Sequence, residues 1–71
     1  MDYNQNELVK LATQSMPHGK YKGRLFIDLP ENYVIWCYNN CLPQGELGNL
    51  LGLLYEIKIN GLEYLVQKLK S

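Results

Sequence analysis

The stretch that most constrains the fold is residues 43–60, because apolar side chains occupy most sides of the helix that it predicts. At about 100° per residue, an aliphatic ridge with Ile57 at its flank consists of Leu47, Leu50, Leu51 and Leu54. A narrow polar stripe, interrupted by Leu53, consists of Glu46, Asn49, Glu56 and Asn60. A helix that is apolar on most sides lies at the centre of a fold. We therefore expect a long central helix that ends near residues 60–61.

A third side of this helix is lined by glycine. Gly45, Gly48 and Gly52 make it flat, and Tyr55 and Ile59 extend it. Each glycine in a helix costs about 1 kcal/mol relative to alanine, so the close approach of another backbone would explain their presence. That backbone belongs to the second helix, to the predicted hairpin at residues 16–27, or to the same helix of another subunit. These five residues are therefore a candidate interface, and a homodimer is one expected partnership.

Three further segments have the pattern of helices. Residues 4–15 carry apolar positions at helical spacing, and Asn4 is suited to cap their N-terminus. Pro17 requires this helix to end by residue 15 or 16. A second helix is expected from Pro30 to about residue 39, because proline suits the first position of a helix. Residues 62–69 predict a short closing helix.

Residues 16–27 predict a short β-hairpin or a tight ordered turn. Gly19 and Gly23 tolerate a positive φ, and Leu-Phe-Ile at residues 25–27 has the character of a return strand. The expected class is α+β and mostly helical: an N-terminal helix, the hairpin or ordered turn, two longer helices and a short C-terminal helix. A chain of 71 residues is expected to form a single small domain, residues 1–71.

The aromatic side chains of the predicted helices are spaced as residues of helix faces: Tyr33, Trp36, Tyr38, Tyr55 and Tyr64. Such residues pack in a core or at a subunit interface. Trp36 is the expected core anchor, and the number of tyrosines weakly favours an interface.

Composition excludes several classes of protein. The chain is 46% hydrophobic, which is too high for a disordered protein, and its formal net charge is zero, which argues against a strong nonspecific polyanion binder. No apolar run approaches the ~18 residues that would cross a membrane, so no membrane partner is expected. Residues 1–6 have neither the cationic start nor the apolar centre of a signal peptide. We therefore expect a cytoplasmic protein whose cysteines are reduced.

The functional hypothesis depends on residues 16–24, Met-Pro-His-Gly-Lys-Tyr-Lys-Gly-Arg, which we call the basic turn. Backbone N–H groups at two glycines beside three cations can form an anion-binding nest, and a tyrosine face can stack on a base. The candidate residues for binding nucleic acid or phosphate are Gly19, Lys20, Tyr21, Lys22, Gly23 and Arg24. The alternative is a solvated turn whose cations serve solubility, which is an ordinary role for exposed lysines.

Metal and catalytic chemistry are less well supported. Cys37, Cys41 and His18 give three of the four ligands of a structural zinc site, and a buried free thiol is the more ordinary role of such a cysteine. No pair of carboxylates has a spacing that demands acid–base work, and His18 has no evident nucleophile partner. We expect no catalytic residue, no metal and no cofactor, and hence a protein that is not an enzyme.

The chain also resembles a known family. The resemblance rests on MPHGKYKGRL at residues 16–25, DLPE at 28–31, Tyr33 with Trp36, GELG at 45–48 and LYEIKINGLE at 54–63. These motifs, in this order, are similar to small bacterial proteins of unknown function labelled putative quorum-sensing-regulated virulence factors, over residues 8–69. That family usually has phenylalanine where this chain has His18, which implies that His18 is not a required catalytic group.

A second resemblance covers residues 16–37. The GKYKG motif, followed by a helix with Pro30, Glu31, Tyr33 and Trp36, is similar to the small C-terminal module of some DnaQ-type exonucleases. That likeness implies a module that helps to hold DNA through the basic turn. Two hypotheses therefore stand: a non-enzymatic accessory module that contacts DNA or RNA weakly, or a protein-interaction or homodimerisation module that uses the glycine-lined side of the long helix.

Overall fold

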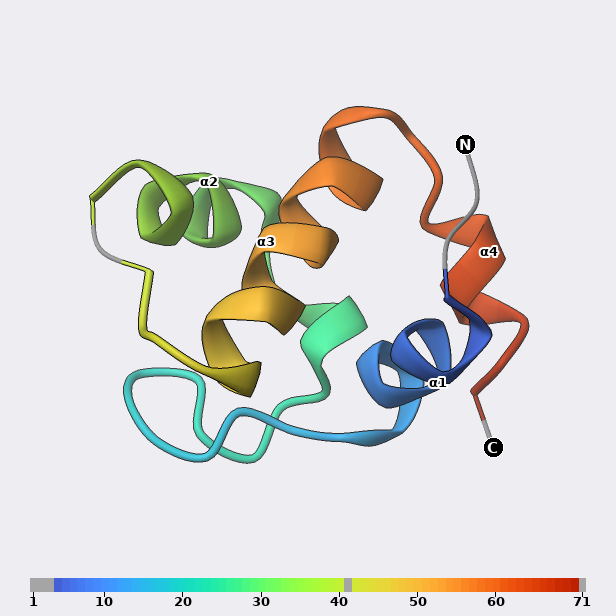
Figure 1. The fold of residues 1–71 in the computed structure, drawn as a ribbon, viewed down its shortest axis with the longest axis horizontal. Helices are drawn as coiled ribbons and strands as arrows, with labels where there is room; N and C mark the ends of the chain where they lie inside the picture. The colour runs from blue at the N-terminus through green and yellow to red at the C-terminus, as the bar shows by residue number, and fades with distance from the viewer. Residues whose placement is uncertain (1–3, 41, 71) are drawn as a thin grey trace.

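Helices make up the framework of residues 4–40 and 42–70, the parts of the chain that the computed structural model describes (Figure 1). In chain order they are α1 (Gln5–Thr13), the 3₁₀ helix η1 (Phe26–Asp28), α2 (Glu31–Asn40), α3 (Glu46–Ile59) and α4 (Tyr64–Gln67). In Figure 1, α3 crosses the middle of the molecule, with α2 on one side and α1 and α4 together on the other. The predicted order of helices is confirmed.

The helix ends follow local chemistry. Asn4 caps α1, because its side-chain oxygen accepts a hydrogen bond of 2.8 Å from the backbone N–H of Asn6. Pro30 precedes α2, and its carbonyl accepts from the N–H of Val34 at 3.1 Å. α4 has four residues where eight were expected, α3 begins at Glu46 and not at residue 43, and α1 ends at Thr13 and not at residue 15.

The core forms around α3, as its apolar pattern predicted. Leu54 and Ile57 of α3 are fully buried, and so are Leu11 of α1, Val34 of α2 and Val66 of α4. One hydrophobic cluster joins buried residues of all the helices. The basic turn is anchored to this cluster by Met16, which is 4% exposed.

The predicted α+β class is wrong, because no strand or sheet forms among the described residues. The two arms of the expected hairpin meet in a single isolated bridge between Ser15 and Leu25. Phe26 and Ile27, expected on a return strand, lie in η1 and are each 2% exposed. Successive residues of a strand point to opposite faces, so a strand would turn one of these two side chains towards solvent. The 3₁₀ turn buries both.

A lysine side chain fastens η1 to the end of α3. The ammonium group of Lys58 donates to the carbonyl of Ile27 at 3.2 Å and lies 3.9 Å from a carboxylate oxygen of Glu63. Its side chain is only 8% exposed. Within the described ranges, no helix has both the length and the apolar character needed to cross a membrane.

Candidate functional site

The basic turn is closed across its base by backbone hydrogen bonds. Met16 N–H donates to the carbonyl of Arg24 at 2.9 Å, and Gly23 N–H donates back to the carbonyl of Met16 at 2.9 Å. The bridge between Ser15 and Leu25 continues this pairing by one step. The turn therefore has a fixed base, although it is not part of a sheet. It is the loop at the bottom of Figure 1.

The tip of the basic turn contains two tighter turns. Lys22 N–H donates to the carbonyl of Gly19 at 3.2 Å, and Arg24 N–H donates to the carbonyl of Tyr21 at 3.0 Å. Gly19 and Gly23 have φ values of 91° and 88°, in a region of backbone conformation that residues with a Cβ rarely adopt. Both glycines therefore have a positive φ, which glycine tolerates. The predicted anion nest is not confirmed at Gly23, because the N–H of that residue already donates to Met16.

Two cations of the basic turn lie against one aromatic ring. The Lys20 ammonium is 5.5 Å from the centroid of the Tyr21 ring, and the Arg24 guanidinium carbon is 5.4 Å from the same centroid. Lys22, between them in sequence, is exposed. These distances are within the range of cation–π attraction. The turn thus presents positive charge gathered around Tyr21, which is half-buried.

Tyr21 begins a row of aromatic side chains that continues onto α2. Its ring packs edge-on against Tyr33, with centroids 4.6 Å apart and planes at 66°. Tyr33 in turn lies beside Trp36, with centroids 6.5 Å apart and planes at 19°. We call Tyr21, Tyr33 and Trp36 the aromatic row. It joins the basic turn to the surface of α2.

The prediction that Trp36 anchors the core is wrong. Its side chain is 58% exposed, whereas Val34 and Cys37 supply the buried side of α2. The sequence predicted Trp36 as a core residue and therefore missed it as a surface residue. The signal that was present is the spacing of three between Tyr33 and Trp36, which makes two helical residues neighbours.

Among the described residues, the cations of the basic turn form no ion pair with a carboxylate. The ion pairs among described residues are Lys10–Glu46 at 2.6 Å, Lys58–Glu63 at 3.9 Å and Lys70–Asp28 at 2.9 Å. Within the described parts of the chain, Lys20, Lys22 and Arg24 take part in no ion pair, and residues 14–27 contain no Asp or Glu. The chain as a whole is neutral, but this surface carries cations that have no ion-pair partner in residues 4–40 and 42–70.

The hydroxyl of Tyr33 is held in its neutral form. Burial, and secondly the neighbouring Cys37 thiol, raise the pKa of this hydroxyl above its ordinary value. Its oxygen also lies close to Gly19: a Cβ added there would be 3.8 Å away from it. Tyr33 therefore faces the basic turn as a neutral phenol that supports both Gly19 and Tyr21.

The glycine-lined side of α3 is covered mainly by the chain itself. A Cβ on Gly48 would collide with the backbone carbonyl of Pro43, so the close backbone approach is real but comes from the segment just before α3. A Cβ added at Gly52 would lie 4.0 Å from the Leu42 side chain. Gly45 precedes α3 with a φ of 82°.

The other two residues of the predicted interface, Tyr55 and Ile59, differ in their surroundings. Tyr55 stacks on Tyr38 of α2, with centroids 3.9 Å apart and planes at 2°. Ile59 and Tyr38 remain 47% and 45% exposed. An apolar surface is therefore left at this end of α3.

The three potential zinc ligands are not assembled in the described structure. Cys37 is buried and free, His18 is exposed, and Cys41 lies outside the described residues. Among the residues that the structure describes, no group of three metal-ligating side chains occurs.

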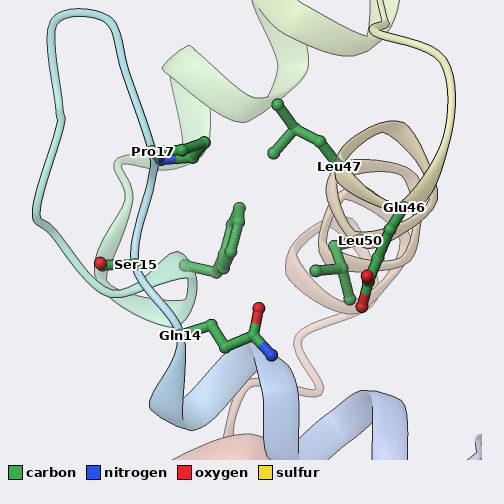
Figure 2. A pocket seen from close by; sticks show the side chains of 7 residues that line it. Gln14, Ser15, Pro17, Glu46, Leu47 and Leu50 are labelled. Atoms are coloured by element: carbon green, nitrogen blue, oxygen red, sulfur yellow. The ribbon is translucent and has the colours of Figure 1, made fainter.

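A shallow hollow of about 200 Å³ lies between the base of the basic turn and the start of α3 (Figure 2). Figure 2 shows Pro17 and Leu47 on opposite sides of it, with Gln14 below. Its remaining lining residues are Ser15, Phe26, Glu46 and Leu50. The Glu46 carboxylate is already paired with Lys10, and the hollow contains none of the predicted binding residues.

Comparison with known proteins identifies the family. A bacterial family described as "Putative quorum-sensing-regulated virulence factor" matches residues 4–69. The chain belongs to this family. Two curated relatives are each 46% identical over 67 residues, covering 93% of this chain and 93% of their own length. They are the uncharacterized protein YpeB of Escherichia coli strain K12 and that of Escherichia coli O157:H7.

The resemblance noted in the sequence is thereby confirmed for this family, over nearly the whole chain. No solved structure matches the chain. The family description names a form of regulation and states no biochemical activity, and the relatives' names assign none. These comparisons do not test the likeness to the exonuclease module, which stays a hypothesis.

Proposed function

We propose that this protein is a non-enzymatic accessory module that contacts nucleic acid, or another phosphate-bearing ligand, through the basic turn. One observation carries the proposal: Lys20 and Arg24 flank the Tyr21 ring at 5.5 and 5.4 Å on a turn whose base is closed by hydrogen bonds. Positive charge next to an aromatic face suits a ligand that combines phosphate with planar bases.

The rigidity of the basic turn supports this role. A flexible loop must lose conformational freedom when it binds, and that loss weakens binding. Here the backbone is already fixed by bonds at its base and its tip, and Met16 holds it to the core. The backbone that carries the cations is therefore in place before any ligand arrives.

The expected affinity is modest. Three cations release few counterions, so the logarithm of the binding constant is expected to fall with the logarithm of salt concentration with a slope of about −2 to −3. A net charge of zero adds no long-range attraction. Binding is therefore best measured at low salt.

The test is fluorescence anisotropy with labelled single- and double-stranded oligonucleotides. The variant Lys20→Ala, Lys22→Ala, Arg24→Ala is expected to lose most binding. The matched control is Lys10→Ala, Lys68→Ala, Lys70→Ala, which makes the same change in net charge outside the basic turn. Circular dichroism verifies that both variants fold. If the turn variant binds as well as the parent protein, the proposal is wrong.

The chemistry of the basic turn also underlies its non-enzymatic description. Lysine, arginine and tyrosine hold and stack on ligands, and residues 16–24 contain no paired nucleophile and base. The cytoplasmic location expected from the sequence belongs to the same proposal, since nucleic acid is available there. Incubation with DNA, RNA or nucleotides is expected to leave them intact, as judged by mass spectrometry.

One observation favours the alternative, a self-association or protein-interaction module. Tyr38 and Ile59 leave an exposed apolar surface beside the Tyr38–Tyr55 stack. Contact between two subunits through this surface would bury apolar area. A chain of 71 residues buries little of its surface by itself, so this contact would stabilise it. Light scattering over a range of concentrations tests this: a constant monomer mass removes the alternative, and a dimer that Ile59→Ser dissociates supports it.

A further inference from the structure

We infer that the ligand of this surface is an unpaired nucleic-acid strand, whose bases stack on the aromatic row while its phosphates face the cations of the basic turn. This inference rests on the proposed function and narrows it to a class of ligand. It assigns Trp36, which lies outside the basic turn, to the binding surface.

Trp36 is the first observation behind the inference. Its indole is 58% exposed, although tryptophan is a residue that proteins usually bury for most of its area. The Tyr33 ring lies beside it, with centroids 6.5 Å apart and planes at 19°. An exposed aromatic face is a surface on which a base can stack.

Continuity with the basic turn is the second observation. Tyr33 lies beside both Tyr21 and Trp36, with ring centroids 4.6 and 6.5 Å away, and Tyr21 carries Lys20 and Arg24 against its ring. Aromatic faces and cations therefore form one surface. In Figure 1 the basic turn and α2 lie towards the same side of the molecule, away from α1 and α4.

This combination favours a single strand over a duplex. In a duplex the base faces are covered by their neighbours, so an aromatic row has only the sugar–phosphate backbone to contact. In a single strand the faces are free, and stacking on aromatic side chains adds binding at each base. A duplex is therefore expected to use the cations alone.

Aromatic rows also bind proline-rich peptides. The charge on this surface favours phosphate instead, since Lys20, Lys22 and Arg24 have no carboxylate partner within the described residues. A neutral proline-rich peptide would leave these cations unused. It therefore serves as a competing ligand in the test.

The experiment uses the intrinsic fluorescence of the protein, because Trp36 is its single tryptophan. The protein is titrated at low salt with a 12-nucleotide thymidine strand, a 12-base-pair duplex, a proline-rich peptide and inorganic phosphate. Quenching is expected with the single strand, and little change with the other three.

Variants then separate stacking from charge by anisotropy. Trp36→Ala is expected to weaken single-strand binding roughly 5- to 100-fold, which is the effect of losing one stacked base. Its salt dependence should stay as in the parent, because the cations remain. Trp36→Phe is expected to restore most of the affinity, and Tyr64→Ala, which removes another exposed aromatic residue, should have no effect.

The outcomes distinguish this inference from the function on which it rests. If the turn variant loses binding while Trp36→Ala binds like the parent, or if duplex and single strand bind equally, the inference is overturned and the proposed function stands. If the turn variant binds like the parent, or nothing binds at low salt, both are overturned. Quenching by the proline-rich peptide alone would assign the surface to a protein partner.

Discussion

The conformation of the basic turn depends on the backbone of Gly23. It has a φ of 88°, and a Cβ added there would meet no atom within 4 Å. Gly23→Ala is therefore expected to cost about 1–2 kcal/mol of folding stability, from backbone strain alone. Urea denaturation measures the loss. A D-alanine at this position, introduced by chemical synthesis, should cost nothing. Equal losses with both forms of alanine would mean that space, and not φ, limits the position.

Tyr33 predicts a dependence of stability on alkaline pH. Burial, and then Cys37, raise the pKa of its hydroxyl in the folded protein, whereas the unfolded chain has the ordinary value of about 10. The folded state therefore retains the proton longer than the unfolded state. This contribution to stability is fully present below pH ~10 and is lost as the pH rises beyond it, with a slope of at most about 1.4 kcal/mol per pH unit.

The measurement is the free energy of unfolding of Tyr33→Phe and of the parent between pH 8 and 11. Phenylalanine has no proton to lose, so the variant should fall less steeply than the parent at the alkaline end. Tyr64→Phe, at a position that is 63% exposed, is the control for removing a tyrosine hydroxyl. Parallel curves for the parent and Tyr33→Phe would contradict the prediction.

At the scale of residues, the sequence predicted local chemistry better than exposure. The Asn4 cap depends on a few neighbouring atoms, and the structure confirms it. The same holds for the turn glycines Gly19 and Gly23, which have the positive φ that glycine tolerates. The exposure of Trp36 depends on how α2 lies on α3. Apolar residues occupy several sides of α2, so its sequence does not select one inward face. The aromatic row could therefore not be predicted without the packing.

At the scale of elements, the segment after the basic turn shows where propensity misleads. Phe26 and Ile27 belong to residue types that favour strands, but a strand requires a partner along its length. Among the described residues, the pairing amounts to one isolated bridge, between Ser15 and Leu25. Without more partners, local hydrogen bonds from Asp28 to Leu25 at 3.0 Å and from Leu29 to Phe26 at 3.1 Å satisfy the backbone as η1. The need to bury two successive side chains decided the outcome.

At the same scale, two glycines of α3, Gly48 and Gly52, are predicted to respond oppositely to substitution by alanine. Gly48→Ala would drive its Cβ into the Pro43 carbonyl, and backbone cannot move aside as a flexible side chain can. We expect a net loss of about 1–3 kcal/mol. Gly52→Ala meets only Leu42 at an ordinary contact distance of 4.0 Å, so the better helix propensity of alanine should stabilise the protein by up to about 1 kcal/mol.

Thermal and urea denaturation of the two variants measure this difference. The pair also bears on self-association, because both glycines belong to the interface that the sequence predicted. If a second subunit packed closely on Gly52, alanine there would weaken the dimer. A destabilised Gly52→Ala protein that has also lost mass by light scattering would therefore contradict the view that the chain covers its own glycines.

At the scale of the whole molecule, one core serves every element, including the basic turn. Met16 ties the turn to the same cluster that contains Leu11, Leu54 and Val66. The sequence predicted the centre of this core because α3 is apolar on most sides. It could not predict that Lys58 would lie 8% exposed on the carbonyl of Ile27, since that bond joins residues 31 apart in the chain.

Because the core is shared, damage at its centre should unfold the whole chain together. A protein of 71 residues is expected to have a total stability of roughly 4–10 kcal/mol. Leu54 is fully buried in α3, and Leu54→Ala is expected to cost about 2–5 kcal/mol, including the cavity that it leaves. That loss approaches the whole stability of the fold, so a large unfolded fraction is expected at 37 °C.

Leu53→Ala is the matched control, because it makes the same change one position along α3, where the side chain is only half-buried. It should cost clearly less, since less apolar area leaves water at that position. Circular dichroism and amide hydrogen exchange in the basic turn follow both variants. For Leu54→Ala, the turn should lose protection together with the helices. If the turn instead keeps its protection while the helices lose theirs, it is stabilised by its own hydrogen bonds, and the candidate site would not depend on the core beneath it.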